Sequence, residues 1–140
     1  MKSFKFGTII NKTNSAVLVS QFIYQKNAPA IQNELFHIPS NQTLSLNKAI
    51  EMQMVEEKVY TAPLLIKKET DTNIEMLLSV TWGEAIFLDM KVQNLHTQET
   101  IEIETIIKRA AINDNCIPNV DLIIEGEQLE KSHATIYYTH

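Results

Sequence analysis

The chain has 140 residues, of which 44% are apolar and 21% are charged, and its formal net charge is −5. This length and composition predict one globular domain, residues 1–140, that buries its core without help from a metal or a disulfide. The excess of acidic residues argues against binding to a nucleic-acid backbone, and the single cysteine, Cys116, excludes an intrachain disulfide.

Most of the chain alternates between apolar and polar residues, as half-buried β-strands do, because successive side chains of a strand point to opposite faces. The strands predicted outside the central region are 4–10, 16–24, 31–38, 63–68, 120–124 and 134–138. The strand at 16–24 is apolar on both faces, which predicts a central position or a layer above it. A loop is predicted at 112–119, where Asn113-Asp114-Asn115 favours turns and Pro118 cannot donate a hydrogen bond to a ladder.

The segment 43–60 fits two patterns. A set of apolar residues at even positions favours strands: Leu44, Leu46, Ile50, Met52 and Met54. The alternative is a helix that Asn47 would cap and that would run through Lys58, with its apolar stripe formed by Leu46, Ala49, Ile50 and Met54. We prefer the strand interpretation.

The most informative pattern is a predicted meander of three strands between residues 74 and 107. Its apolar residues are even-numbered in the first two strands and odd-numbered in the third. We predict that Val80 faces Leu88, through an odd-numbered connection that keeps the large apolar side chains on one face. The alternative is a two-residue Gly83-Glu84 turn, which would place Leu78 opposite Asp89.

The third strand of the meander is predicted to follow a loop at 95–98. This loop sets Val92 opposite Ile101 and Met90 opposite Ile103.

The same register gives the meander an outer face with three apolar side chains. Phe87 would lie opposite Ile106, with Leu77 on the same face. Such a cluster predicts cover by another part of the chain or by a partner. Leu77, Phe87 and Ile106 are therefore the candidate partner-binding residues.

Taken together, roughly nine or ten short strands separated by frequent turn signals predict an all-β fold. The preferred architecture is a single antiparallel β-sandwich, and a β-barrel is the alternative.

No pattern of reactive residues predicts a catalytic residue, a metal site or a cofactor. The four histidines, His37, His96, His133 and His140, lack the close spacing of metal ligands. Cys116 has no sequence context typical of a nucleophile, and the chain has no glycine-rich phosphate loop.

These observations favour a non-catalytic binding or assembly module that acts through a sheet face or edge, with a protein partner or a second copy. One alternative is a small-ligand or metal-using enzyme in which His37, His133 and Asp114 meet in space. Another is a sandwich that docks on membranes through calcium held by Asp114 and the acidic pair Glu69 and Asp71. No segment reaches the roughly 18 apolar residues of a membrane span, and no signal-peptide core is visible, so we expect a cytoplasmic protein, with leaderless export left open.

Overall fold

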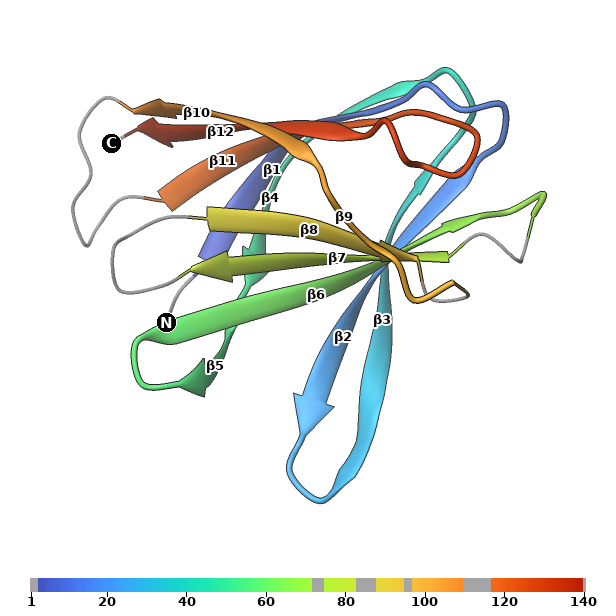
Figure 1. Cartoon of the computed structure of the whole chain (residues 1–140). Coiled ribbons are helices and arrows are strands. Elements are labelled where there is room, and N and C mark those ends of the chain that lie inside the picture. The colour runs from blue at the N-terminus through green and yellow to red at the C-terminus, as the bar shows by residue number, and fades with distance from the viewer. Residues whose placement is uncertain (1–2, 72–74, 83–87, 95–96, 110–116, 140) are drawn as a thin grey trace.

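The computed structural model describes residues 3–71, 75–82, 88–94, 97–109 and 117–139, and this part of the chain forms twelve β-strands. Two curled sheets pack against each other, which confirms the predicted β-sandwich (Figure 1). The ambiguous segment at 43–60 is strand, as preferred. The strands are β1 (Ser3–Asn11), β2 (Val17–Gln25), β3 (Ala28–Ile38), β4 (Thr43–Glu51), β5 (Gln53–Glu56), β6 (Val59–Lys68), β7 (Glu75–Trp82), β8 (Leu88–Asn94), β9 (Thr100–Glu102), β10 (Glu104–Arg109), β11 (Ile117–Ile124) and β12 (His133–Thr139).

The strands are divided between a five-stranded and a seven-stranded sheet. The first has the order β10-β12-β11-β1-β4, and the second has the order β3-β2-β6-β7-β8-β9, with β5 beside one end of β6. Most neighbours are antiparallel, but β1 pairs with β11 and β10 pairs with β12 in parallel. The sandwich is therefore mixed rather than wholly antiparallel.

The chain passes from one sheet to the other twice through a single buried residue. Met52 joins β4 to β5, and Ile103 joins β9 to β10. The ladder of β8 and β9 ends at the pair of Lys91 and Glu102, and β10 pairs with β12 of the other sheet, so the predicted pair of Met90 and Ile103 is not part of the ladder. An alternating pattern cannot reveal such a change, because both sheets bury their inward residues in the same core.

In the hairpin of β7 and β8, even-numbered residues lie opposite even-numbered residues, as predicted, but the exact partners differ. Val80 lies opposite Met90 rather than Leu88, and Trp82 lies opposite Leu88. The predicted connection lies within residues 83–87, outside the described part of the chain. The predicted pair of Val92 and Ile101 is confirmed.

Pro118 lies inside β11 rather than in a loop, and it pairs with Tyr138 of β12. On the other side of β11, the ladder with β1 begins only at Asn119. Pro118 therefore sits near a strand start with one neighbouring strand, where its missing N–H is tolerated.

Aromatic side chains from both sheets meet in the core. Phe6 of β1 lies edge-on between Phe4, at 5.1 Å between ring centroids, and Phe36 of β3, at 5.9 Å. All three rings are buried, and such pairs are worth about 0.5–1.5 kcal/mol beyond the burial of their area. The pair of Phe6 and Phe36 joins β1 of one sheet to β3 of the other.

A β-bulge interrupts β1 at Gly7, where its register with both β4 and β11 shifts. The Thr8 N–H donates a 3.0 Å hydrogen bond to Oδ1 of Asp121. A Cβ atom at position 7 would lie 2.7 Å from the same oxygen, so the close approach of the Asp121 side chain requires glycine there.

One end of the sandwich is closed by a polar corner built on the fully buried Asn11. Its Nδ2 donates to the carbonyls of Ser15, Ile38 and Pro39, and its Oδ1 accepts from the N–H and the hydroxyl of Thr13. The side chain thus joins the end of β1 to the end of β3 and satisfies its own buried polar atoms.

Leu129 closes the same end from the loop between β11 and β12. Its side chain is buried although its backbone has a φ of 62°, a conformation that is costly for a leucine. The loop is held by the Ser132 hydroxyl, which donates to the Leu129 carbonyl at 2.8 Å. Packing of the side chain therefore holds the backbone in a strained conformation.

In the described part of the chain, no helix has the length and apolar character needed to span a membrane.

Candidate functional site

The hairpin of β2 and β3 extends beyond the rest of its sheet (Figure 1). β2 pairs with β6 only from Val17 to Gln21, and β5 lies beside the remaining part of β6. We call residues 22–32, which form a ladder of β2 and β3 alone, the projecting hairpin. A two-stranded ribbon of this kind is only marginally stable by itself, so its base must be anchored.

Gln53 provides one of the anchors. Its side-chain Oε1 accepts a 2.9 Å hydrogen bond from the Tyr24 N–H, and its Nε2 donates a 3.1 Å bond to the Tyr24 carbonyl. A side-chain amide thereby makes the two bonds that a neighbouring strand would make to β2.

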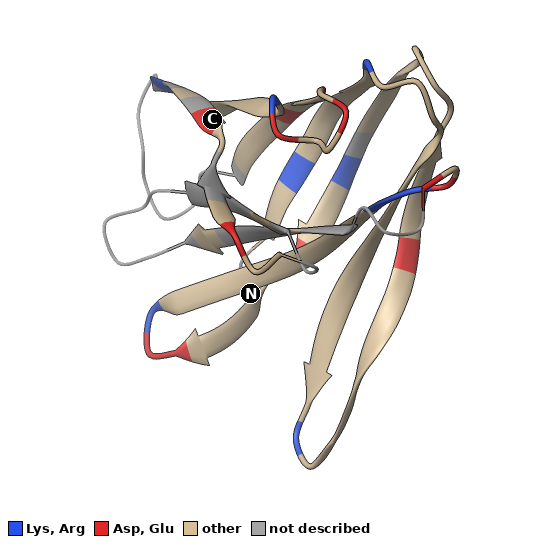
Figure 2. Cartoon of the chain, turned by 45° about the vertical axis from the view of Figure 1, so that its right-hand side comes forward, with Lys and Arg blue, Asp and Glu red and all other residues tan. Residues whose placement is uncertain are grey.

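The opposite edge of the projecting hairpin is the free edge of β3. β3 is the terminal strand of its sheet in the described structure, and every residue from Ala28 to Glu34 is exposed. Ile31 and Tyr24 are large apolar side chains with exposed fractions of 45% and 55%. The turn residue Lys26 is the only charged residue of the projecting hairpin, which is otherwise uncharged in Figure 2.

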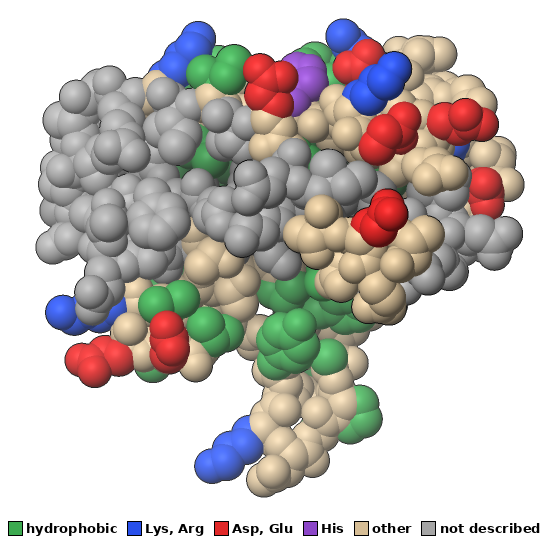
Figure 3. Space-filling model, in the orientation of Figure 1, with side chains coloured by type: hydrophobic (Ala, Val, Ile, Leu, Met, Phe, Trp, Pro, Cys, Tyr) green, Lys and Arg blue, Asp and Glu red, His purple; other side chains and the backbone are tan. Residues whose placement is uncertain are grey.

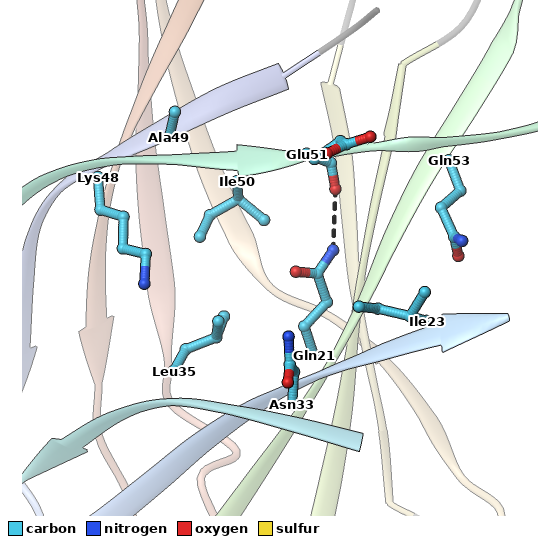
Figure 4. A pocket seen from close by; sticks show the side chains of 9 residues that line it. All are labelled: Gln21, Ile23, Asn33, Leu35, Lys48, Ala49, Ile50, Glu51 and Gln53. Atoms are coloured by element: carbon cyan, nitrogen blue, oxygen red, sulfur yellow. Dashed lines mark hydrogen bonds between the residues drawn. The ribbon is translucent and has the colours of Figure 1, made fainter. Parts of the chain in front are cut away.

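A groove of about 310 Å³ lies between the base of this hairpin and the edge strand β4 of the other sheet (Figure 4). We call it the sheet-edge groove. The space-filling view shows apolar side chains gathered near the base of the projecting hairpin (Figure 3). Gln21, Ile23, Asn33 and Leu35 line the groove from β2 and β3, and residues 48–51 and Gln53 line it from β4 and β5.

A hydrogen bond crosses the groove and ties the two sheets together. The buried side chain of Gln21 donates from Nε2 to the main-chain carbonyl of Glu51 at 2.8 Å. The Glu51 carboxylate points away from Gln21, whereas the Lys48 side chain points from β4 toward Leu35 (Figure 4).

Lys48 is exposed, and its side chain runs along the groove toward Leu35. Its Nζ lies 5.6 Å from the centroid of the Phe36 ring, a distance at which a cation is attracted to an aromatic face. Among the described residues, it forms no ion pair with a carboxylate. The lining of this hollow combines four apolar residues with three side-chain amides, Lys48 and Glu51, so it offers both apolar surface and polar groups to a ligand.

The structure places two of the predicted partner-binding residues in different sheets. Leu77 is half-buried on β7 of the seven-stranded sheet. Ile106 is 49% exposed on β10 of the five-stranded sheet, where it pairs with Thr135. Phe87 lies outside the described residues. Leu77 and Ile106 therefore do not share the single sheet face that was predicted from the register, and contact of the three residues with a partner stays a prediction.

The histidines proposed for the alternative enzyme also lie in different sheets. His37 on β3 bonds through Nε2 to Oε1 of Glu69 at 2.9 Å, and both side chains are about half exposed. His133 lies on β12, opposite Ile123 of β11. Asp114, Cys116, His96 and His140 fall outside the described residues, in which no group of three His, Cys, Asp or Glu side chains could hold a metal ion.

A second hollow, of about 380 Å³, lies near the polar corner between the loops at 12–14 and 125–131. Its charged lining residues are Lys12, Lys131, Glu125 and Glu127. The buried Lys68 lies beside these loops, and its Nζ donates to Asn14 Oδ1 at 3.0 Å and to the Glu127 carbonyl at 3.1 Å. Because these contacts tie the two loops together, we assign Lys68 a structural role.

Comparison of the chain with protein-family models, with curated proteins and with solved structures found no match.

Proposed function

We propose that the protein is a non-catalytic binding module that recruits an extended segment of a partner polypeptide to the free edge of β3. The observation that carries this proposal is the exposed, one-sided pairing of β3 along the projecting hairpin. In strand addition of this kind, main-chain hydrogen bonds supply affinity, and the pockets that receive alternate side chains supply specificity.

The other sheet edges are less suited to this role. β9 has three residues and β5 has four, which makes both edges short. β10 carries the exposed charged residues Glu104 and Lys108, and β4 carries the inward-pointing Lys48, and charges of this kind discourage pairing at an edge. β3 is the longest strand at eleven residues. Its protective features are Pro29, the exposed Glu34 and two register shifts with β2, one next to Leu35 and one between Ala28 and Ile31. The stretch 30–33 between Pro29 and Glu34 carries no charge.

A bound strand would also complete the projecting hairpin. Two strands alone are marginal in water, and a third strand adds a second ladder and covers apolar side chains such as Ile31. The free energy gained on binding would therefore also stabilise the two-stranded projecting hairpin.

The test is selection from a random nine-residue peptide display library on the immobilised full chain, with Ile31→Lys as a counter-screen. We expect peptides with alternating apolar residues whose binding weakens about tenfold or more in Ile31→Lys, because a charge at position 31 opposes strand addition. Met54→Lys is the matched control, because Met54 is also an exposed apolar strand residue and lies on β5.

Three outcomes would contradict the proposal: no peptide is enriched, the enriched peptides bind Ile31→Lys as well as the wild type, or Met54→Lys abolishes binding equally. Amide hydrogen exchange gives a second readout. A bound peptide should protect main-chain amides within 30–33, and unchanged exchange there would show that the peptide binds elsewhere.

A further inference from the structure

The inner face of β4 has one charged residue in a row of apolar ones. Inward side chains alternate along the strand and continue to Met52 just after it, and the exposed Lys48 takes a position in the series Leu44, Leu46, Lys48, Ile50 and Met52. The neighbouring Ile50 and Met52 are buried. A lysine in such a series places a cation where the sandwich would otherwise present only apolar surface.

The cation lies within reach of the free edge of β3. The sheet-edge groove extends from Asn33 and Leu35 of β3 to Lys48 of β4, and the Lys48 ammonium is above the Phe36 ring. A strand added to the free edge of β3 would lie about 4.8 Å from β3, the usual spacing of neighbouring strands. The side chains of that strand on the groove side would then point toward β4, opposite the stretch 33–36.

We propose that Lys48 selects an acidic side chain in the segment that binds to β3, so that the ligand is an extended peptide with a carboxylate flanked by apolar residues at alternate positions. This proposal rests on the proposed function. Lys48 has no carboxylate partner among the described residues, and the amide groups of Gln21 and Asn33 in the same groove can donate further hydrogen bonds to a carboxylate.

The groove favours an acidic group over a second cation or a purely apolar side chain. An added apolar side chain would cover the ammonium without pairing it, and burial of an unpaired charge is costly. The Glu51 carboxylate does not serve as an internal partner, because it points away from the groove. The charge of Lys48 would therefore select the peptide side chain at one position, whereas the main-chain hydrogen bonds to β3 would form with peptides of any sequence.

The experiment repeats the peptide selection on the full chain carrying Lys48→Glu, with Lys12→Glu as the control. Lys12 is exposed at the other end of the sandwich, so this control changes the net charge equally. We expect the wild type and Lys12→Glu to enrich Asp or Glu at one position, and Lys48→Glu to enrich Lys or Arg there.

Titration of one selected peptide against its carboxamide analogue, with Gln for Glu or Asn for Asp, quantifies the interaction. We expect about a tenfold weaker affinity of the analogue for the wild type and no difference for Lys48→Met, which keeps the length of the side chain without its charge. Thermal unfolding of each variant verifies that it is folded.

Equal binding of peptide and analogue to the wild type, or the same enriched residues with Lys48→Glu, would overturn the role of Lys48. If such peptides still require Ile31, the edge-binding function stands without this selectivity. If no edge-dependent peptide is enriched, both proposals fail. Self-association of Lys48→Met, with unchanged peptide preference, would instead make Lys48 a residue that keeps the β4 edge from pairing.

Discussion

The Nε2 group of Gln21 in one sheet donates a 2.8 Å hydrogen bond to the main-chain carbonyl of Glu51 in the other sheet. This bond lies where β2 leaves β6 and the projecting hairpin begins. It sets the separation of the two sheets at the point where the sheet-edge groove forms, so it links the stability of the sandwich to the shape of the candidate site.

Replacement of Gln21 by methionine, which has a similar length and no amide, should lower the free energy of unfolding by about 1 kcal/mol. Urea unfolding followed by circular dichroism measures this as a lower midpoint with an unchanged slope. Gln25→Met, at an exposed position of the same strand, is the control and should shift the midpoint little. Equal effects of the two changes would mean that the bond across the groove contributes nothing.

The bulge at Gly7 should make the chain sensitive to a single methyl group. Gly7→Ala brings a Cβ within 2.7 Å of the Asp121 carboxylate and should destabilise the fold by about 2 kcal/mol. In the double variant with Asp121→Ala, the alanine at position 7 should cost much less, because the atom that it meets is gone. Additive losses in the double variant would contradict a direct clash.

Two substitutions of Leu129 separate the free-energy cost of its strained backbone from the stability gained by burial of its side chain. Leu129→Ala should cost about 3 kcal/mol through loss of packing. Glycine in place of alanine normally costs a further 0.5–1 kcal/mol or so, but at a φ of 62° it removes the strain that alanine would retain. We therefore expect Leu129→Gly to be at least as stable as Leu129→Ala in thermal unfolding, and a clearly less stable glycine variant would contradict this reading.

The anchoring role of Gln53 predicts a local change in hydrogen exchange. Gln53→Ala should speed exchange of the Tyr24 amide about tenfold, since the bond from that N–H to Oε1 is lost. Gln53→Glu keeps an acceptor oxygen and should restore part of the protection. Exchange at Val19, in the part of β2 flanked by β3 and β6, should be the same in all three proteins.

The fold class was predictable because alternation reports burial directly. The same pattern placed Val92 opposite Ile101, and it kept the face of each residue in the hairpin of β7 and β8. It missed that register by two residues, because Val80 can face either Leu88 or Met90 without moving a side chain to the other face. Burial determines which face each side chain takes, whereas the exact partner of each residue depends on the length of the connection.

The candidate site was much less predictable. At Ile103 the chain passes to the other sheet without a change in the alternation of apolar and polar residues. This change of sheet separates Ile106 from Leu77. The projecting hairpin follows from β5 lying beside β6 in the place that β2 has left, a tertiary event with no local signal. One local signal was present at Lys48, a charged residue at an even position within an apolar series. Recognising it requires the knowledge that even positions of this segment face inward.

The parallel pairing of β1 with β11 sets the order in which the chain can fold during its synthesis. Thr8 and the Asp121 side chain that caps its N–H are 113 residues apart. The antiparallel neighbours β6, β7 and β8 can pair as they leave the ribosome, but one side of β1 has no partner until β11 has been made. Until then that side of β1 is an unpaired edge next to Phe4 and Phe6, so the ladder that completes this sheet is among the last parts of it to form.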